Sequence, residues 1–346
     1  MLATQLDTPV LTCDLDILEQ NIHRMTDMLH SFGLRSRIHI KTHKIPEIAL
    51  MQLATADEGI TCQKLGEAEV MAQAGIKDIL IPYNIIGREK LERLVRLCKR
   101  ANITVAIDSE FTARGISEAM ETAGCSVGVI VELDTGGRCG LQSPEAAVTL
   151  GELIDRLPGL RLKGLMAMPT PPNTSGFIGT TVRAFKEAGL STEIVSGGGS
   201  VPAFTANHVE GLTEHRAGTY VYGDCSLLHA GLYTVEQCAM RVLVTVVSRP
   251  TPDRAIIDGG SKTFTNDGRQ PFHYILEYPQ AKIMAQSEEH GHVDVSECPI
   301  KPKLSERLTV IPNHACGTTN LHDEMVGLRK GEVEVIWPIL ARGKIR

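Results

Sequence analysis

The chain has 346 residues, of which 42% are hydrophobic and 4% aromatic, and its formal net charge is −6. This length and apolar content suit one large α/β domain plus a smaller one, with ample hydrophobic core. The slight acidity, without a basic excess, argues against nucleic acid and anionic surfaces as partners. No run of about eighteen apolar residues occurs, which argues against a membrane-spanning helix.

The N-terminus and the cysteine content indicate the compartment. The start, MLATQLDTP, lacks the charged n-region and the apolar h-region of a signal peptide. The cysteines number nine, an odd count, and never form a CxxC motif. Such usage fits a reducing environment better than a disulfide framework. We therefore expect a cytoplasmic protein.

Short apolar runs alternate with amphipathic stretches over the first two thirds of the chain. In chain order the runs lie at residues 10–12, 38–40, 59–61, 78–81, 103–107, 127–132, 162–166 and 193–195. Eight buried strands, each followed by a helix, predict an α/β fold with a (β/α)8 barrel of TIM type over residues 9–238. A doubly wound open sheet is the alternative. The number of strands, with polar or glycine residues at nearly every strand end, favours the barrel.

The pattern changes from about residue 239. Strand-like runs separated by turn residues, with few helical stretches, occur at residues 240–247, 254–258, 308–311 and 332–337. They predict a β-rich C-terminal domain over residues 239–346, with residues 1–8 packing with it.

The segment RIHIKTHK at residues 37–44 ends a strand-like run in a cluster of basic side chains. Lys41 lies there among cationic neighbours at an apolar strand end, where a lysine amine can lose its proton. A neutral amine can attack a carbonyl and hold it as a Schiff base. The alternative is a cationic strand end on a solvated face, which is what charge clusters usually are.

Two later strand ends carry groups that suit an anionic ligand. The loop ELDTGGRCG at residues 132–140 contains Arg138, which could donate to a phenolic or carboxylate oxygen or be an exposed turn residue. In SGGGS, at residues 196–200, three glycines let backbone N–H groups converge on a phosphate, unless they form only a flexible turn. The stretch HRAGTY at residues 215–220 adds a glycine and further donors. Together with Lys41, these loops indicate a phosphorylated, carbonyl-bearing cofactor, and pyridoxal phosphate meets that description.

The segment PNHACG at residues 312–317 is a candidate metal site. At a strand end, the spacing of His314 and Cys316 would place imidazole and thiolate on one side, where they could share Zn²⁺ or a similar ion. Two protein ligands would leave positions open for substrate oxygens. A lone His-x-Cys pair is more often structural. The HDE segment at residues 322–324 could supply outer-shell carboxylates or be plain surface.

These segments, taken in order, resemble one known family. The residues that carry the resemblance are those at 37–44, 63–69 (QKLGEAE), 134–140, 196–199, 214–220, 288–291 (EEHG), 312–316 and 341–343. Together they resemble the D-threonine aldolase and D-serine dehydratase family of fold-type III pyridoxal-phosphate enzymes. That family shares an alanine-racemase-like barrel followed by a β domain, and the resemblance runs over nearly the whole chain.

The resemblance implies roles for individual residues. Lys41 matches the Schiff-base lysine, Arg138 the arginine that contacts the phenolic oxygen of the cofactor, and Arg216 the arginine that faces its pyridine nitrogen. His314 and Cys316 match the divalent-metal pair (Zn²⁺ or Mn²⁺) of D-serine dehydratases, whereas the better-known aldolases carry aspartate at the second position. The further cofactor-binding positions, mostly at the phosphate, are Ser196, Gly198, Gly199, Ser200, Gly218 and Thr219.

The chain also departs from the family pattern. Isoleucine, at Ile38, replaces the proline usual before the His39 position. Where relatives carry a tyrosine after the seventh strand, this chain has MPTPP at residues 168–172, and the segment from there to Ser196 is shorter. The missing aromatic residue near Met168 leaves the substrate pocket, and hence the substrate, open.

By resemblance the protein is a lyase that depends on pyridoxal phosphate and a divalent metal and acts on a small D-3-hydroxy amino acid. Retro-aldol cleavage to glycine and an aldehyde is the expected reaction, because the segments at residues 62–64 and 320–323 read more like the aldolases. Dehydration of D-serine is the alternative, which Cys316 favours. A racemase is less favoured because no tyrosine is marked as a second base. A non-catalytic cofactor carrier is less favoured because such carriers resemble the barrel alone. A homodimer is also implied.

Overall fold

The structure is a computed structural model that describes residues 1–268 and 270–346. The chain forms two compact units. The first, here called the barrel unit, comprises Arg24–Lys41, Pro46–Gly218 and Lys344–Arg346. The second, here called the sheet unit, comprises Met1–His23, Thr42–Ile45 and Thr219–Gly343.

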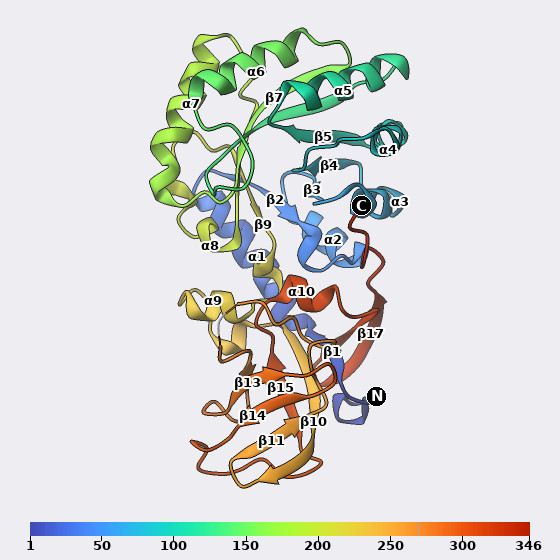
Figure 1. Ribbon diagram of the computed structural model, residues 1–346, viewed down its shortest axis with the longest axis vertical. Helices are drawn as coiled ribbons and strands as arrows, with labels where there is room; N and C mark the ends of the chain where they lie inside the picture. The colour runs from blue at the N-terminus through green and yellow to red at the C-terminus, as the bar shows by residue number, and fades with distance from the viewer. Residues whose placement is uncertain (269) are drawn as a thin grey trace. The chain divides into compact units, whose positions relative to one another are not determined.

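The barrel unit contains, in the part of the chain that the structure describes, a closed barrel of eight parallel strands in which β9 pairs back onto β2 (Figure 1). The strands are β2 (Arg35–His39), β3 (Ile60–Thr61), β4 (Asp78–Ile81), β5 (Asn102–Ile107), β6 (Val127–Leu133), β7 (Leu160–Ala167), β8 (Ile194–Gly198) and β9 (Glu214–Ala217). The helices between them are α2 (Pro46–Leu53), α3 (Leu65–Gln73), α4 (Arg88–Cys98), α5 (Glu110–Thr122), α6 (Pro144–Arg156), α7 (Ser175–Glu187) and α8 (Ser200–Ala203). The predicted (β/α)8 barrel is confirmed.

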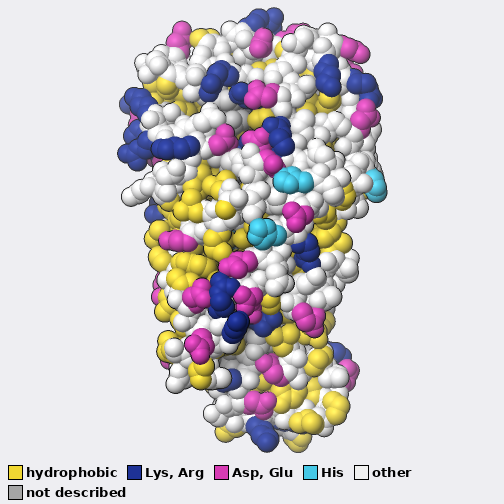
Figure 2. Space-filling view, turned by 180° about the vertical axis from the view of Figure 1, so that it is seen from behind, with side chains coloured by type: hydrophobic (Ala, Val, Ile, Leu, Met, Phe, Trp, Pro, Cys, Tyr) yellow, Lys and Arg dark blue, Asp and Glu magenta, His cyan; other side chains and the backbone are white. Residues whose placement is uncertain are grey.

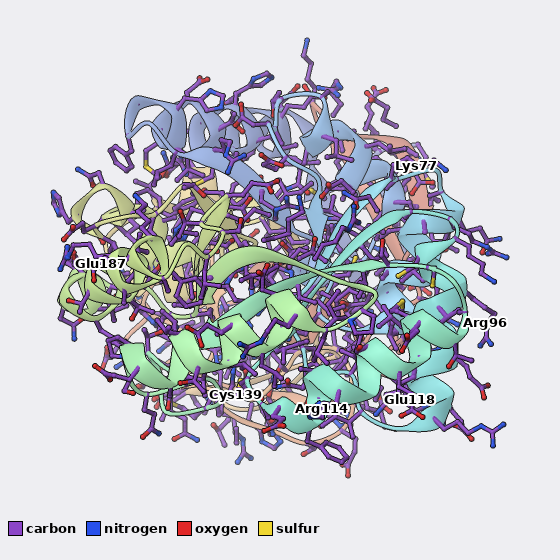
Figure 3. The ribbon with its side chains drawn as sticks, turned by 90° about the horizontal axis from the view of Figure 1, so that it is seen from above. Lys77, Arg96, Arg114, Glu118, Cys139 and Glu187 are labelled. Carbon is purple, nitrogen blue, oxygen red and sulfur yellow. The ribbon has the colours of Figure 1, made fainter. Side chains whose placement is uncertain are left out.

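Burial on both faces explains why the barrel strands read as continuous apolar runs. All residues of β6 are buried, as expected for a parallel strand with barrel interior on one side and helices on the other. A buried cluster joins five consecutive strands through Leu80, Ala106, Ile130, Met166 and Ile194. The surrounding helices turn their charged side chains outward, as the labelled residues of α4 and α5 show in Figure 3.

Two strand predictions were wrong. Residues 10–12 are not the first barrel strand: β1 (Val10–Asp14) pairs with β10 and β16 in the sheet unit. The eighth barrel strand is instead β9, which has no apolar run because Glu214, His215 and Arg216 are all buried polar residues. Lys41 therefore follows the first strand of the barrel rather than the second.

The sheet unit contains a nine-stranded sheet within residues 1–268 and 270–346, and β10 is its longest strand. Its strands are β1, β10 (Met240–Thr251), β11 (Arg254–Ile257), β12 (Tyr274–Ile275), β13 (Lys282–Gln286), β14 (Gly291–Asp294), β15 (Arg307–Ile311), β16 (Glu324–Arg329) and β17 (Glu332–Pro338). Its helices are α9 (Cys225–His229), α10 (Ala315–Thr319) and the start of α1 (Leu15–Ser31). The first half of β10 alternates buried and half-buried residues, as expected where one face of a sheet covers the core. The four predicted strands of this part are confirmed, and β12, β13, β14 and β16 were missed.

The surface carries both charge signs. Figure 2 shows acidic and basic side chains interspersed over the face that it presents. Across the described residues, no helix combines the length and the apolar character needed to cross a membrane.

Candidate active site

Lys41 lies in the short 3-10 turn η2 (Ile40–Thr42), directly after β2, and is half-buried. Its backbone N–H donates to Nδ1 of His39 at 3.4 Å, and Nε2 of His39 lies 3.2 Å from Oε1 of Gln63. Since Nδ1 accepts, Nε2 carries the ring proton. Burial, and then the positive charges of Lys41 and Arg216, hold the pKa of His39 well below its usual range. A neutral imidazole thus fixes the backbone of the lysine turn.

Arg216, in β9, is buried and only partly hydrogen-bonded. Its Nη2 donates to the carbonyl of Ala167 at 3.1 Å, whereas Nη1 has no hydrogen-bond partner among the described residues. Burial lowers the pKa of Arg216 to about 10, although the carboxylates of Glu214 and Glu132 oppose the shift. Oε2 of Glu132 is likewise buried without a partner in the described part of the chain, and burial raises the pKa of this carboxyl. Buried polar atoms left unpaired in a folded protein indicate a missing water or ligand.

Arg138 extends the same group of charges from the loop after β6. Its Nη2 lies 3.5 Å from Oε1 of Glu132, which also accepts from Sγ of Cys139 at 3.3 Å. The Arg138 side chain is 51% exposed, so its guanidinium is free to turn toward another acceptor. We call the group formed by these strand-end residues the barrel cluster, which consists of His39, Lys41, Glu132, Arg138 and Arg216.

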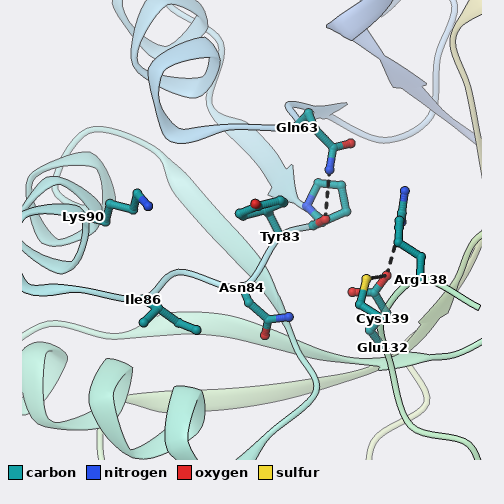
Figure 4. A pocket seen from close by; sticks show the side chains of 9 residues that line it. Gln63, Tyr83, Asn84, Ile86, Lys90, Glu132, Arg138 and Cys139 are labelled. Atoms are coloured by element: carbon teal, nitrogen blue, oxygen red, sulfur yellow. Dashed lines mark hydrogen bonds and ion pairs between the residues drawn. The ribbon is translucent and has the colours of Figure 1, made fainter. Parts of the chain in front are cut away.

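A pocket of about 490 Å³ opens beside the barrel cluster (Figure 4). Glu132 and Arg138 form part of its wall, and Gln63, the partner of His39, forms another part. Tyr83 also lines the pocket, and Nζ of Lys64 lies 3.6 Å from the centre of its ring. The hydrogen bond from Lys64 lowers the pKa of the Tyr83 phenol. The lining thus combines the buried carboxylate of Glu132 and the cations Lys90 and Arg138 with apolar groups such as Ile86.

The glycine loop after β8 meets the loop after β9. Oγ of Ser200 accepts from the backbone N–H of Gly218 at 3.1 Å, and the N–H of Gly199 donates to the carbonyl of Arg216 at 3.1 Å. Gly199 has a φ of +109°, which favours glycine. A Cβ on Gly198 would lie 2.9 Å from Nη2 of Arg216, so the absence of a side chain allows the guanidinium to pack closely on this loop. The predicted phosphate positions Gly198, Gly199, Ser200 and Gly218 are thus brought together next to Arg216.

Two other predicted cofactor residues lie elsewhere. Ser196 is fully buried, and its hydroxyl donates to Oε1 of Glu214 at 2.5 Å, so this group is already engaged inside the barrel. Thr219 begins the turn η5 (Thr219–Val221) and belongs to the sheet unit, where its Oγ1 lies 4.0 Å from Sγ of Cys316.

His314 and Cys316, here called the metal pair, lie at the start of α10 rather than on a strand, because β15 ends at Ile311. His314 is the N-cap residue and Cys316 is the second residue of the helix. The expected alternation along a strand was therefore wrong, and a helical turn brings the two side chains together instead. The hydrogen bond with Cys316 raises the pKa of His314 to about 10, although burial opposes the shift; the charge interaction with Cys316 and the contact with Asp267 add to it. The hydroxyl of Thr42 also lies 3.3 Å from Sγ of Cys316.

The carboxylate beside the metal pair is one that sequence reasoning missed. Oδ2 of Asp267 lies 2.6 Å from Nδ1 of His314, although the two residues are 47 positions apart in the chain. The predicted alternative at residues 322–324 has other partners: His322 bonds the carbonyl of Thr263, and Asp323 pairs with Arg342 at 3.1 Å. No motif links Asp267 to the His-x-Cys segment, so only the fold reveals it.

Asp224 anchors the backbone between the two members of the metal pair. Its buried Oδ2 accepts from the N–H of Ala315 at 2.9 Å, while Oδ1 accepts from the N–H of Ser226 and so caps α9. No group of three or more His, Cys, Asp or Glu side chains suited to a metal occurs among the described residues. A metal held by His314 and Cys316 alone would keep coordination positions open.

Comparisons with known proteins place the chain in a family. A family model described as "Alanine racemase, N-terminal domain" matches residues 13–226, and one described as "Putative serine dehydratase domain" matches residues 239–328. A 3-hydroxy-D-aspartate aldolase of Paracoccus denitrificans (strain Pd 1222) is 32% identical over 99% of this chain and 93% of its own length. A D-threonine aldolase of an Arthrobacter species is 34% identical over 98% of this chain and 93% of its own length.

Solved structures and a further sequence relative agree with these matches. The crystal structure of a D-threonine aldolase from Filomicrobium marinum has a TM-score of 0.92 and 33% identity, and the match covers 99% of this chain and 97% of that one. A D-threo-3-hydroxyaspartate dehydratase of Delftia sp. (strain HT23) is 30% identical over 90% of this chain and 92% of its own length. A cysteine-to-alanine variant of a D-threo-3-hydroxyaspartate dehydratase, solved in a metal-free form, has a TM-score of 0.88 and 27% identity, with 98% of both chains covered. The chain is therefore an enzyme of the lyase class and belongs to the D-threonine aldolase and D-serine dehydratase family, which has an alanine-racemase-like fold.

Proposed function

We propose that this enzyme is a pyridoxal-phosphate- and divalent-metal-dependent lyase that cleaves D-3-hydroxy amino acids to glycine and an aldehyde. The observation that carries the proposal is the barrel cluster, in which a half-buried lysine follows a strand beside a buried arginine with an unpaired Nη1. The aldolases among the relatives, at 32% and 34% identity over nearly the whole chain, support the choice of cleavage.

The residues present fit pyridoxal phosphate. Nη1 of Arg216 and Oε2 of Glu132 are buried without partners in the described part of the chain, so the site lacks an acceptor and a donor that a bound ligand could supply. Gly198 packs closely against Arg216, next to the point where Ser200 and Gly218 meet. Arg138 is exposed enough to reach a phenolic oxygen. When bound, the cofactor would supply an electron sink for negative charge that develops on the α-carbon.

Lys41 would hold the cofactor through its Nζ. When not joined to the cofactor, this Nζ would be a base in the site, able to take a proton from the substrate. His39 supports the lysine turn by accepting its backbone N–H, and its depressed pKa keeps it neutral, so it adds no positive charge beside the amine.

The metal pair fits a catalytic divalent ion. Imidazole and thiolate together suit Zn²⁺ better than Mn²⁺. A metal on two protein ligands would act as a Lewis acid on the 3-hydroxyl of the substrate, lowering the pKa of that oxygen.

Dehydration is the second candidate function, and Cys316 favours it. A cysteine-to-alanine variant of a D-threo-3-hydroxyaspartate dehydratase, solved in a metal-free form, is among the similar structures. The two reactions differ in the proton that the base removes: the hydroxyl proton for cleavage, and the α-proton for elimination.

A substrate panel tests the proposal. The purified protein is first checked for a yellow chromophore that borohydride bleaches. It is then incubated with D-threonine, 3-hydroxy-D-aspartate, D-serine and D-alanine, with and without a chelator. Aldehyde and glycine that disappear with chelator support the proposal. Pyruvate from D-serine, or oxaloacetate from 3-hydroxy-D-aspartate, supports dehydration instead. Chelator-insensitive formation of L-alanine, or no bound chromophore, would overturn it.

A further inference from the structure

We propose that Asp267 is a positioning residue for the metal pair: it holds the His314 ring through Nδ1 and so presents Nε2 to the metal. The inference rests on the proposed metal site. It gives a role to Asp267, a residue that neither the family resemblance nor the sequence pattern had indicated. It predicts that metal affinity depends on a side chain that does not itself bind the metal.

The first support is the hydrogen bond itself. Oδ2 of Asp267 lies 2.6 Å from Nδ1 of His314, a short distance of the kind seen when one partner is charged. A histidine whose Nδ1 is engaged in this way has only Nε2 left for a metal. The Asp267 carboxylate therefore sets both the tautomer and the ring orientation of His314.

The second support is the exposure of both side chains. The His314 side chain is 42% exposed and that of Asp267 is 54% exposed, so packing alone does not fix either one. An exposed histidine samples several rotamers unless a bond restrains it. The hydrogen bond therefore orients His314 and Asp267, whereas burial orients Arg216 and Glu132 of the barrel cluster.

The third support is that Asp267 is itself held in place. Its Oδ1 accepts from the hydroxyl of Thr265 at 2.5 Å, and its backbone carbonyl accepts from Nδ2 of Asn313, the neighbour of His314. The N–H of Asn313 in turn donates to Nδ1 of the buried His273 at 2.8 Å. A chain of bonds thus runs from the sheet core to the carboxylate, which keeps Oδ2 aimed at the ring.

The loop that carries Asp267 also packs on α10. The N–H of Thr265 lies 3.4 Å from Oγ1 of Thr318, and a Cβ on Gly317 would lie 2.8 Å from Cβ of Thr265. Gly317 thus lets the loop approach the helix that carries Cys316. Loop and helix form one local assembly around the metal pair.

Metal binding by purified full-length variants tests the inference. The proteins are freed of metal with a chelator, and Zn²⁺ affinity is measured by competition with a chromophoric chelator. Co²⁺ spectra then report the thiolate charge-transfer band and the ligand field. Asp267→Ala is expected to weaken Zn²⁺ binding about 10- to 100-fold, as loss of such partners commonly does, and to change the Co²⁺ ligand-field bands while keeping the thiolate band. Asp267→Asn, which keeps an acceptor oxygen, is expected to lose less than about 10-fold.

Controls separate this role from others. Asp253→Ala, at another exposed aspartate of the sheet unit that pairs with Lys301, should bind Zn²⁺ as the parent does. Thermal unfolding of each metal-free protein checks that the fold is kept. If Asp267→Asn lost as much affinity as His314→Ala, Asp267 would be a direct ligand and the inference would be wrong. Parental affinity in Asp267→Ala would also overturn it, while leaving the proposed function standing. If the parent bound no metal, both would fall.

Discussion

Arg216 and Glu132 of the barrel cluster are held in place in a different way from His314 of the metal pair and its partner Asp267. Arg216 and Glu132 are almost completely buried, and their environment leaves one polar atom of each without a partner in the described part of the chain. His314 and Asp267 are half-exposed and bonded to each other. Burial fixes the orientation of a polar side chain but can leave its polar atoms without hydrogen-bond partners, which a ligand can then supply. An exposed side chain instead needs a hydrogen-bond partner to fix its orientation. The barrel cluster should therefore be sensitive to volume and charge, and the metal pair to the loss of single hydrogen bonds.

Removal of the lysine amine should have the largest effect. Lys41→Ala is expected to lose activity by about 10³-fold or more, because the amine both holds the cofactor and serves as a base. The check is the cofactor absorbance and peptide mapping after borohydride reduction. Lys77→Ala, at an exposed lysine before β4, is the matched control and should keep both signals. A reduced adduct on another lysine would contradict the assignment.

A change of donor atom in the metal pair should have the next largest effect. Cys316→Asp replaces a soft thiolate by a hard carboxylate, so the ratio of Zn²⁺ to Mn²⁺ affinity is expected to fall by about 10-fold or more. Metal titration of the chelator-treated protein measures it, and Cys98→Ser, in α4, is the control. An unchanged ratio would show that Cys316 is not a ligand.

A methyl group in the glycine loop should have a moderate effect. A Cβ at Gly198 would lie 2.9 Å from both Nη2 of Arg216 and Cγ of Met168, so the arginine has to move. Gly198→Ala is expected to lower kcat/KM by roughly 10- to 100-fold through this displacement. Gly176→Ala, in α7, has no atom within 4 Å of the added Cβ and should leave kcat/KM unchanged. Equal activity of both variants would mean that the glycine loop is not part of the site.

The smallest effect concerns acid stability. His215 is buried beneath the glycine loop, its Nε2 donates to the carbonyl of Gly199 at 2.9 Å, and burial lowers its pKa from 6.5 to about 4. The unfolded chain therefore takes up a proton before the folded chain does, so stability is full above about pH 6.5 and declines as the pH falls toward 4. The loss reaches at most about 3 kcal/mol at pH 4.

His215→Gln keeps an N–H donor but cannot be protonated, so its stability should fall less between pH 7 and pH 4.5 than that of the parent. Urea unfolding at both pH values measures the difference. His208→Gln, at an exposed histidine, is the control and should follow the parent curve.

The parts of the site that could be predicted were those with local signals. Lys41, Arg138 and the triple glycine follow apolar runs directly, and the His-x-Cys pair lies within one short segment. The strand order could not be read so well. Three of the four residues of β9 are buried and polar, and Glu214 among them is paired with the distant Arg37, so the strand lacks the apolar run by which a strand is recognised. β1 is buried between β10 and β16, and a central strand of a mixed sheet reads like a barrel strand.

Residues that act through partners far away in the chain could not be predicted from the sequence. Asp267 reaches His314 only because the loop before β12 folds over α10, and Glu132 matters only because barrel closure places Arg216 within its electrostatic reach. Neither relationship has a fixed spacing. Such groups are set by tertiary structure and not by local pattern.

The polar character of β9 has a practical consequence for laboratory evolution of this enzyme. Glu214 bonds both Arg37 and Ser196, His215 bonds Gly199, and the Arg216 guanidinium bonds Ala167, so every polar side chain of the strand is tied to a different neighbour. Libraries that aim to change substrate preference can vary the pocket lining around Tyr83 and Lys90 with little risk to the scaffold. Randomising β9 would remove these contacts and is expected to destabilise the barrel, so its codons are best left constant.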